Sequence, residues 1–412
     1  MPVRSTIVMK FLLLLLPVWL IGCSDTDPDI AYIAVIDAGS SGSRVFLYER
    51  SVVGNVVQVR SMTDQEITTK EGLSASENSP TEAGPKNVQP LLDGLAPVLA
   101  NNNLRPQQVQ IHLLATAGMR LVESRSPAAA DAIYASARKT LAASGMSVGR
   151  VETLTGTYEG VYSWVDVNYL KGNFREPAQT PEGIIEVGGA SAQVAYVSPS
   201  AAGENAVSVS INGKSYRLFS TSWLGLGQNE ARGAMISSTA ASGSGTVDNV
   251  CYPNNPSAAG GIQAFDADVP GKTITISSGQ YDLTKCKTLY SAVIQPFNVG
   301  LASGNADFAN TRFMGVSSVY FSLRDWRGLN QPVDLALNLN KTCASWPAVF
   351  DWLGGGNAAT KFQQNSCANG TYIHSLLFGD QGLKVDPEKL TSVSKVDGQS
   401  FSWTRGFALI GR

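Results

Sequence analysis

The stretch IAVIDAGSSGSRVFLY, residues 33–48, contains the pattern that decides the fold. An apolar run ends in Asp37, a turn of Gly and Ser follows, and a second apolar run begins after Arg44. The pattern returns in GIIEVGGASAQVAYV, residues 183–197, where the acid is Glu186. In both stretches we predict two strands joined by a tight tip, with an acid at the end of the first strand.

Both tips have the composition of an anion-binding loop. Gly and Ser leave backbone N–H groups and hydroxyls accessible with little steric bulk. An acid beside such a tip can hold a hydrated divalent cation that neutralises the same anion. Because the two units lie roughly one domain length apart, they predict two domains that face one phosphate chain across a cleft.

The rest of the chain alternates between strand and helix patterns, which is typical of an α/β protein. Strands are predicted at 109–115 and 147–153, helices at 127–142, 160–170, 287–302 and 372–378, and loops at 199–206 and 237–262. The apolar tail, residues 400–412, is expected to pack rather than fray.

Length and composition exclude several classes of protein. At roughly 100–200 residues per domain, 412 residues predict two domains. Hydrophobic residues make up 43% and the formal net charge is −2, which excludes a disordered chain and gives no overall basic character for nucleic-acid binding. With 2 histidines in the chain, a histidine-rich metal site is not expected.

The first 23 residues are typical of an export signal. Arg4 and Lys10 precede an apolar run, residues 11–21, which is too short for the ~20 residues that span a bilayer. The ending Gly22-Cys23 is similar to a bacterial lipobox, in which the cysteine carries the lipid. We therefore expect an exported lipoprotein of the bacterial cell envelope; a plain signal peptide is the alternative.

Four cysteines remain after Cys23, and none lies in a CxxC motif. In an exported chain they predict two disulfides. Three pairings are possible, and nearest-neighbour pairing closes the shortest loops. The four are Cys251, Cys286, Cys343 and Cys367.

Five segments, in order, resemble the signatures of the apyrase family, the nucleoside triphosphate diphosphohydrolases. They are DAGSSGSR at 37–44, ATAGMR at 115–120, GTYEG at 156–160, EVGGASAQ at 186–193 and WTRG at 403–406. The Cys343 and Cys367 pair also falls where the family tends to place a disulfide. The resemblance spans nearly the whole chain after the export signal.

The resemblance implies an α/β fold of the actin, Hsp70 and sugar-kinase type, with the active site between two lobes. Lobe I is expected to hold residues 30–165 and to take back the C-terminal segment 396–412; lobe II is expected to hold residues 166–395. The resemblance implies nucleotides as partners. The lipobox adds a membrane, through the lipid, and the balanced charge gives no reason to expect a nucleic-acid partner; the protein is expected to be a monomer.

The resemblance also implies roles for single residues. Glu159 resembles the family's catalytic base, and Ser191 and Gln193 are expected to hold the attacking water. Asp37 and Glu186 are expected to anchor Mg²⁺ or Ca²⁺ through its waters. The residues implied in phosphate binding are Ser40, Ser41, Gly42, Ser43, Arg44, Thr116, Ala117, Gly188, Gly189 and Ala190. Tyr320 is the candidate for stacking on the nucleobase.

Two departures from the family pattern, and two alternatives, remain open. Glu186 stands where the family usually has Asp, and its longer reach leaves the metal geometry and preference open. Arg405 replaces a usual apolar residue in the fifth signature.

An exopolyphosphatase-like hydrolase would use similar loops and the same general fold. A surface lipoprotein that binds nucleotide without turnover would need neither Glu159 nor Gln193.

Overall fold

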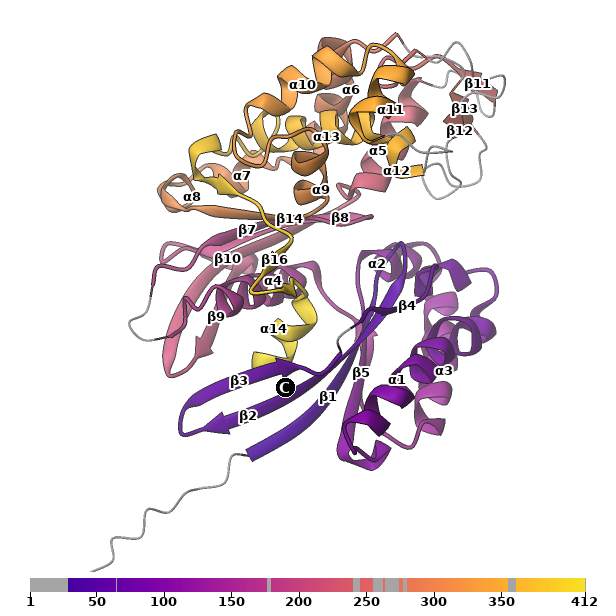
Figure 1. The fold of residues 1–412 in the computed structure, drawn as a ribbon, viewed down its shortest axis with the longest axis vertical. Helices are drawn as coiled ribbons and strands as arrows, with labels where there is room; N and C mark the ends of the chain where they lie inside the picture. The colour runs from indigo at the N-terminus through magenta and orange to yellow at the C-terminus, as the bar shows by residue number, and fades with distance from the viewer. Residues whose placement is uncertain are drawn as a thin grey trace, which may run out of the picture.

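The computed structural model describes residues 29–63, 65–175, 179–239, 245–254, 262–263, 274–276, 280–354 and 361–411. Two mixed sheets lie one above the other, each with helices on its outer face (Figure 1). The export signal and Cys23 lie outside the described residues. None of the helices within the described residues is both long and apolar enough to cross a membrane.

The first sheet has the strand order β3-β2-β1-β5-β6, with β4 paired to β2. Its strands are β1 (Asp29–Ala38), β2 (Ser43–Val53), β3 (Val56–Ser61), β4 (Ile67–Thr68), β5 (Val109–Ala115) and β6 (Ser147–Thr153). Its outer helices are α1 (Gln89–Asn101), α2 (Ala117–Arg125) and α3 (Pro127–Ala143), with short turns of helix at Leu73–Ser76, Pro80–Glu82, Gly84–Val88 and Pro106–Gln108. Strands β1 and β5 run parallel, so their carboxyl ends lie at the same edge of the sheet.

The second sheet has the order β15-β14-β7-β8-β10-β9. Its strands are β7 (Gly183–Val187), β8 (Ser191–Val197), β9 (Ala206–Ile211), β10 (Lys214–Leu224), β14 (Phe313–Ser317) and β15 (Leu390–Thr391). The helices of this half are α5 (Gln228–Thr239), α6 (Leu283–Ile294), α7 (Gly300–Ser303), α8 (Ala306–Asn310), α9 (Ser318–Asp325), α10 (Asp334–Thr342), α11 (Trp346–Trp352), α12 (Lys361–Gln364) and α13 (Ser366–Phe378). The described elements also include five short strands: β11 (Gly245–Val247), β12 (Ile262–Gln263), β13 (Ile274–Ile276), β16 (Lys395–Val396) and β17 (Gln399–Ser400). Three helical turns lie at Gly203–Asn205, Gln295–Phe297 and Pro387–Lys389.

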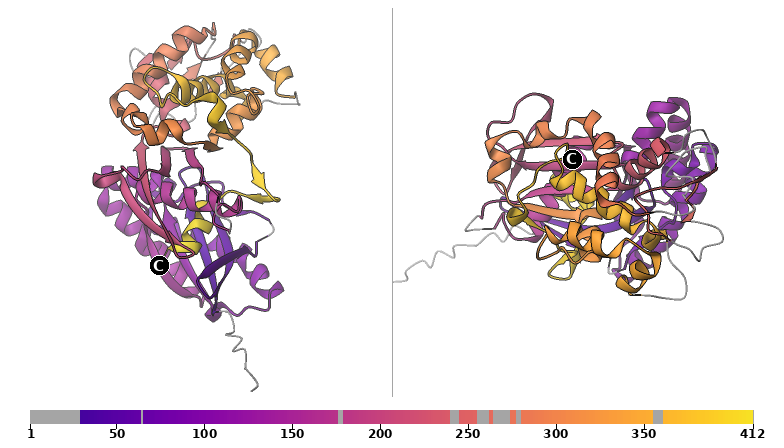
Figure 2. Two further views of the ribbon diagram at one scale, coloured as in Figure 1. Left: turned by 90° about the vertical axis from the view of Figure 1, so that its left-hand side faces the viewer. Right: turned by 90° about the horizontal axis from the view of Figure 1, so that it is seen from above.

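Two helices form a layer between the sheets: α4 (Gly156–Leu170) and α14 (Trp403–Ile410). They share a core with Val35 and Leu114 of the first sheet and with Ala195 and Leu218 of the second. Figures 1 and 2 show the C-terminal segment running from the upper helices down to this layer. The molecule is therefore built as helices, sheet, helices, sheet, helices, and one core joins its two halves.

Most of the predicted elements are confirmed. Both hairpins form with the predicted tips, and the strands at 109–115 and 147–153 match β5 and β6. The loop predicted at 199–206 is followed by an antiparallel hairpin, β9–β10, that was not predicted. The packed tail is a helix, α14.

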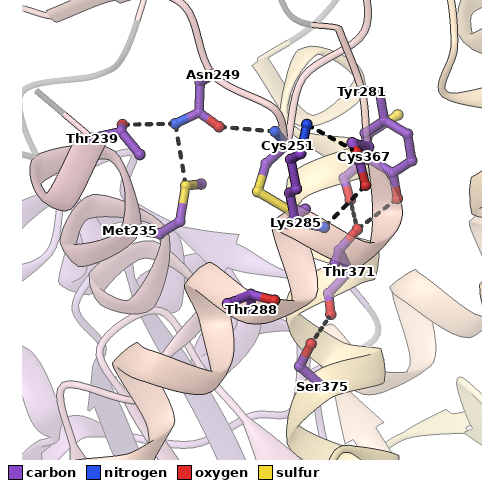
Figure 3. The surroundings of a disulfide bond; sticks show 12 residues. Met235, Thr239, Asn249, Cys251, Tyr281, Lys285, Thr288, Cys367, Thr371 and Ser375 are labelled. Atoms are coloured by element: carbon purple, nitrogen blue, oxygen red, sulfur yellow. Dashed lines mark hydrogen bonds and ion pairs between the residues drawn. A yellow bond between two sulfur atoms is a disulfide. The ribbon is translucent and has the colours of Figure 1, made fainter.

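The described cysteines form the nearest-neighbour pairs, Cys251–Cys286 and Cys343–Cys367. Figure 3 shows the surroundings of Cys251, whose backbone amide donates to Asn249. The Asn249 amide group in turn donates to Thr239 of α5. The Cys343–Cys367 bond joins the end of α10 to α13, which is buried almost throughout. Both disulfides thus fasten elements of the helical half to its core.

Replacing Cys343 and Cys367 together by Ser lowers the free energy of unfolding by about 3–4 kcal/mol. The bond closes a loop with a sequence separation of 24 residues, and opening it returns that conformational freedom to the unfolded chain. Urea unfolding of the oxidised protein and of the double variant measures the difference. An unchanged midpoint, with the slope also unchanged, would contradict the prediction.

Candidate active site

The two hairpin tips meet at the edge where the parallel strands end. The tip of residues 39–42 joins β1 to β2, and the tip of residues 188–190 joins β7 to β8. A Cβ atom placed on Gly189 would lie 2.6 Å from Ser40 Oγ, so the tips face each other at contact distance. A side chain at position 189 would therefore require the Ser40 hydroxyl to move.

Hydrogen bonds orient the second tip. The carbonyl of Gly188 accepts from Gln228 N at 2.8 Å, and the carbonyl of Gly189 accepts from Asn229 N at 2.9 Å, both in the first turn of α5. The carbonyl of Ala190 accepts from Gly225 N at 2.8 Å. The carbonyls of the tip thus point at these donors. The amides of Gly189 and Ala190 have no backbone acceptor among the described residues. Adjacent free amides of this kind form an anion-binding nest.

The first tip is similar. Among the described residues, the amides from Gly39 to Gly42 have no backbone acceptor. Helix α2 packs directly against this tip, because a Cβ atom on Gly118 would lie 2.9 Å from Ser40 Cα. That close approach requires glycine at position 118. It also places the first turn of α2, with Thr116 and Ala117, beside the tip, where helix-terminal amides favour an anion.

Three acids lie within electrostatic reach of one another: Asp37 at the end of β1, Glu186 in β7 and Glu159 in the first turn of α4. Burial raises the pKa of Asp37 to about 6 and that of Glu159 to about 8, and it also raises the pKa of Glu186. The charge of Glu186 raises the pKa of the other two as well. A set of buried carboxyls that disfavour each other's charge is a good site for a cation.

Asp37 and Glu186 fit a cation held through water. Arg44 pairs with Asp37 across the β1–β2 register and lowers the pKa of both acids. No group of three or more His, Cys, Asp or Glu side chains within the described residues is arranged to ligate an ion directly. Two carboxylates and neighbouring hydroxyls agree with the hard oxygen donors that Mg²⁺ and Ca²⁺ prefer, and Mg²⁺ usually keeps several waters.

The longer side chain of Glu186 is fixed at both oxygens. Ser163 Oγ of α4 donates to Oε2 at 2.6 Å, and Ser317 Oγ donates to Oε1 at 3.1 Å. Ser317 has a φ of 58°, an uncommon conformation for a residue with a side chain. We refer to Ser163 and Ser317 as the hydroxyl clamp. It holds the glutamate in one position despite its extra methylene.

The residues expected to hold the water come together around Glu159. Ser191 and Gln193 lie two apart on β8, so their side chains share a face of the sheet. Gln193 Nε2 donates to Ser191 Oγ at 2.5 Å, and the Gln193 side chain also lowers the pKa of Glu159. Both side chains are buried. Gln193 Oε1 is a buried acceptor without a hydrogen-bond partner among the described residues.

The sequence did not single out Arg120, although it lies in the second signature. Its guanidinium pairs with Glu159 Oε2, and it reaches Ser191 Oγ at 3.4 Å and Ser222 Oγ at 3.2 Å. Arg120 thus joins α2 of the first half to strands β8 and β10 of the second. A polar pocket of about 260 Å³ lies beside it, lined also by Gly156 and Thr157 at the start of α4.

Tyr320, the candidate for stacking on the nucleobase, lies on α9, directly after β14 and the clamp residue Ser317. Its ring is 5.4 Å from that of Phe321, which is 51% exposed, and Arg324 lies over Phe321. Trp326 and Tyr372 are fully buried core residues.

A separate cavity of about 570 Å³ is lined by residues of α7, α8 and the segment 380–389. None of the residues predicted for the site lines it.

The molecule has two sheets, a shared middle layer and two glycine-rich tips that face each other. This arrangement defines a two-lobed α/β protein of the actin and Hsp70 type. The sequence matches the GDA1/CD39 (nucleoside phosphatase) family over residues 24–411, and the chain belongs to this family.

Known relatives and structures support this assignment. The chain is 26% identical to the Golgi apyrase of Saccharomyces cerevisiae, over 91% of this chain and 69% of that protein. It is 31% identical to ectonucleoside triphosphate diphosphohydrolase 3 of Mus musculus, over 56% of this chain and 46% of that protein. Among solved structures, a nucleoside triphosphate hydrolase from Neospora caninum has the same fold, with a TM-score of 0.60 and 17% identity over 93% of this chain and 92% of that one. A Ppx/GppA protein from Aquifex aeolicus gives a TM-score of 0.50 at 10% identity, over 92% of this chain and 97% of that one.

Proposed function

We propose that this protein hydrolyses nucleoside tri- and diphosphates to the monophosphate and phosphate. The observation that carries the proposal is the meeting of two tips with free amides next to Glu159, Ser191 and Gln193. The names of the apyrase and diphosphohydrolase relatives support the same activity. The transition state of phosphoryl transfer places charge on the equatorial oxygens, so positioning and charge neutralisation are what such a site must supply.

In the proposed reaction, the tip of residues 39–42 and the amide of Ala117 bind one part of the phosphate chain. The tip of residues 188–190 binds the other part. A Mg²⁺ or Ca²⁺ ion, when bound near Asp37 and Glu186, would neutralise charge on two phosphates. Each group thus acts on the negative charge of the substrate or on its orientation.

Water activation is assigned to α4 and β8. Glu159 accepts a proton from a water that Ser191 and Gln193 orient, while the water oxygen forms a bond to the terminal phosphorus. The bond from that phosphorus to the bridging oxygen breaks, and its electron pair stays on the leaving diphosphate or monophosphate. Among the described residues, His112 accepts a hydrogen bond from Arg150 N and His374 packs against Phe378, and neither has a described contact with Ser40 or Ser191. This supports direct attack by water rather than by a serine.

The test is phosphate release from ATP, ADP, AMP and long-chain polyphosphate, with Mg²⁺ and with a chelator. Metal-dependent release from ATP and ADP, but not from AMP, is expected. Release from polyphosphate alone would instead favour an exopolyphosphatase-like hydrolase, the alternative that the sequence left open. Nucleotide binding without any release would make the protein a binder.

Shortening Glu186 to Asp raises the Mg²⁺ concentration for half-maximal activity about 10-fold, because the shorter side chain withdraws from the hydroxyl clamp. The rate at saturating Mg²⁺ changes much less. Ser317→Ala should shift the metal requirement in the same direction, and Ser210→Ala, an exposed serine of β9, should not. Equal metal requirements in all four proteins would exclude Glu186 as the anchor.

We also propose that Cys23 carries a lipid and attaches the exported protein to the bacterial envelope as a monomer. Incorporation of labelled palmitate, lost in Cys23→Ser, tests the lipid.

The division into lobes at residues 165/166 and 395/396 stays a prediction. Tyr320 stays the proposed contact for the nucleobase, supported by its place beside the clamp residue Ser317 and by its exposed neighbour Phe321.

A further inference from the structure

We propose that Arg120 is a catalytic residue that changes partner during the reaction. Before nucleotide binds, its guanidinium pairs with Glu159. When nucleotide binds, the guanidinium transfers to the terminal phosphoryl group, which releases Glu159 to accept the proton of the water. The proposal rests on the proposed hydrolysis and adds to it both a phosphate ligand and a control on the base.

The first step of the argument is position. Arg120 lies one turn after Thr116 and Ala117 on α2, beside the first tip, and its side chain extends to Ser191 just after the second tip. A terminal phosphoryl group held between the two tips therefore lies next to the guanidinium. Arginine binds phosphate oxygens in a planar, two-pronged geometry that suits this place.

The second step is the competition for Glu159. A carboxylate that accepts a charge-assisted hydrogen bond from arginine has that oxygen occupied and its pKa lowered, and both effects weaken it as a base. Arg120 lowers the pKa of Glu159, whereas Glu186 and Asp37 raise it. The side chain of Gln193 is the remaining group that contacts Glu159 and lowers its pKa. Arg120 is therefore the group whose departure makes Glu159 more basic.

The third step is the set of contacts that Arg120 makes in the structure. Its terminal nitrogens contact Glu159, Ser191 and Ser222, but Nε is buried without a hydrogen-bond partner among the described residues. A buried donor without an acceptor is unfavourable, because it has lost its hydrogen bonds to water without replacing them. The two serine contacts, at 3.4 and 3.2 Å, are long. A phosphoryl group, with several oxygens, can satisfy Nε and one terminal nitrogen at the same time.

The chemistry balances without another reactant. Water loses one proton to Glu159 and forms the new P–O bond, and the P–O bond to the leaving phosphate breaks with its electron pair on the bridging oxygen. Arg120 keeps its protons throughout and neutralises charge on the oxygens of the transferred group. An arginine in this role is worth about 10³–10⁵ in rate in other phosphoryl-transfer enzymes.

Calorimetry tests the change of partner without turnover. A non-hydrolysable β,γ-imido analogue of ATP, with Mg²⁺, is titrated into the wild type and into Glu159→Gln near pH 8, in two buffers of different ionisation enthalpy. If Arg120 leaves Glu159, the wild type takes up more protons on binding than Glu159→Gln, since the pKa of the released carboxyl rises. Equal proton uptake in the two proteins would overturn the proposal, whether or not the protein hydrolyses ATP.

Steady-state kinetics test the phosphate contact. Arg120→Met is expected to lower kcat for ATP by about 10³-fold, and Arg120→Lys, which keeps the charge but not the planar fork, by less. Arg125→Met is the matched control, because Arg125 lies on the same helix but pairs with Glu77 at the surface. The profile of kcat/KM reports the pKa of Glu159 in the free enzyme, where Arg120 lowers it, so in Arg120→Met the acid limb of kcat/KM should move to higher pH. The profile of kcat reports the complex with substrate, where Arg120 has already left Glu159, so its acid limb should stay in place.

These pH profiles separate the outcomes. Equal shifts of both limbs would mean that Arg120 stays on Glu159 throughout and only positions the base. Wild-type rates in Arg120→Met would remove it from the reaction. If the wild type hydrolyses nothing but the analogue still causes the extra proton uptake, the proposed hydrolysis fails while the change of partner stands.

Discussion

Replacing Glu159 by Gln lowers kcat for ATP hydrolysis by about 10²–10⁴-fold, which corresponds to roughly 3–5 kcal/mol of barrier. Glutamine has nearly the same shape and can still accept a hydrogen bond from Arg120, but it cannot take a proton from water. Binding of the β,γ-imido analogue should change far less than kcat. Phosphate release and calorimetry on the same preparation measure the two quantities.

The pH dependence gives an independent check on the same residue. Burial raises the pKa of Glu159 to about 8, and a base works only when ionised, so kcat/KM of the wild type should fall as the pH falls below about 8. Glu82→Gln, which changes an exposed glutamate paired with Lys86, should keep the wild-type rate and profile. A Glu159→Gln variant that hydrolyses ATP at the wild-type rate would place the base elsewhere.

Breaking the buried ion pair between Asp166 and Arg405 lowers the free energy of unfolding by about 3–5 kcal/mol. Arg405 Nη1 donates to Asp166 Oδ1 at 2.6 Å, and the two side chains are 5% and 1% exposed. The other oxygen of Asp166 accepts from Ser402 N at 2.7 Å, at the start of α14. Arg405→Met would therefore leave a buried carboxylate with one of its two partners.

The double variant Asp166→Leu with Arg405→Met should recover most of this loss, because it removes both charges from the core. Burial raises the pKa of Asp166 to about 6, above its usual 3.8, so ionisation of this group costs the folded state stability as the pH rises through 6. The double variant should lack that loss. Urea unfolding of single and double variants at two pH values provides the measurement, and additive effects of the two substitutions would contradict the coupling.

The sequence was most informative where function depends on local pattern. Each tip and its acid lie within one hairpin, so the strand periodicity and the Gly/Ser turn were sufficient to predict the two hairpins and the places of Asp37 and Glu186 near the ends of their first strands. The β9–β10 hairpin could have been predicted as well. Its turn is Asn212-Gly213, with φ values of 50° and 77°, and this dipeptide is the strongest short-range hairpin signal.

Contacts between distant segments were beyond the reach of such patterns. Arg120 and Glu159 are 39 residues apart, and they meet because β5 and β6 are neighbours and each is followed by a helix at the same edge. Asp166 and Arg405 are separated by 239 residues, and no sequence pattern around either residue indicates that the two form an ion pair. The hydroxyl clamp on Glu186 likewise comes from α4 and β14, so the effect of Glu in place of Asp could not be judged from the chain alone.

The middle layer has a consequence for how the chain must be made. A polypeptide emerges from the ribosome in order, and α4 is complete long before α14, its partner in the layer. Until α14 arrives, the inner faces of both sheets lack part of their cover, and apolar residues such as Val35 and Leu114 are exposed to other chains. The layer between the sheets can thus be completed only when the last helix has been made, and a chaperone that shields this surface until then would be expected to raise the yield of native protein.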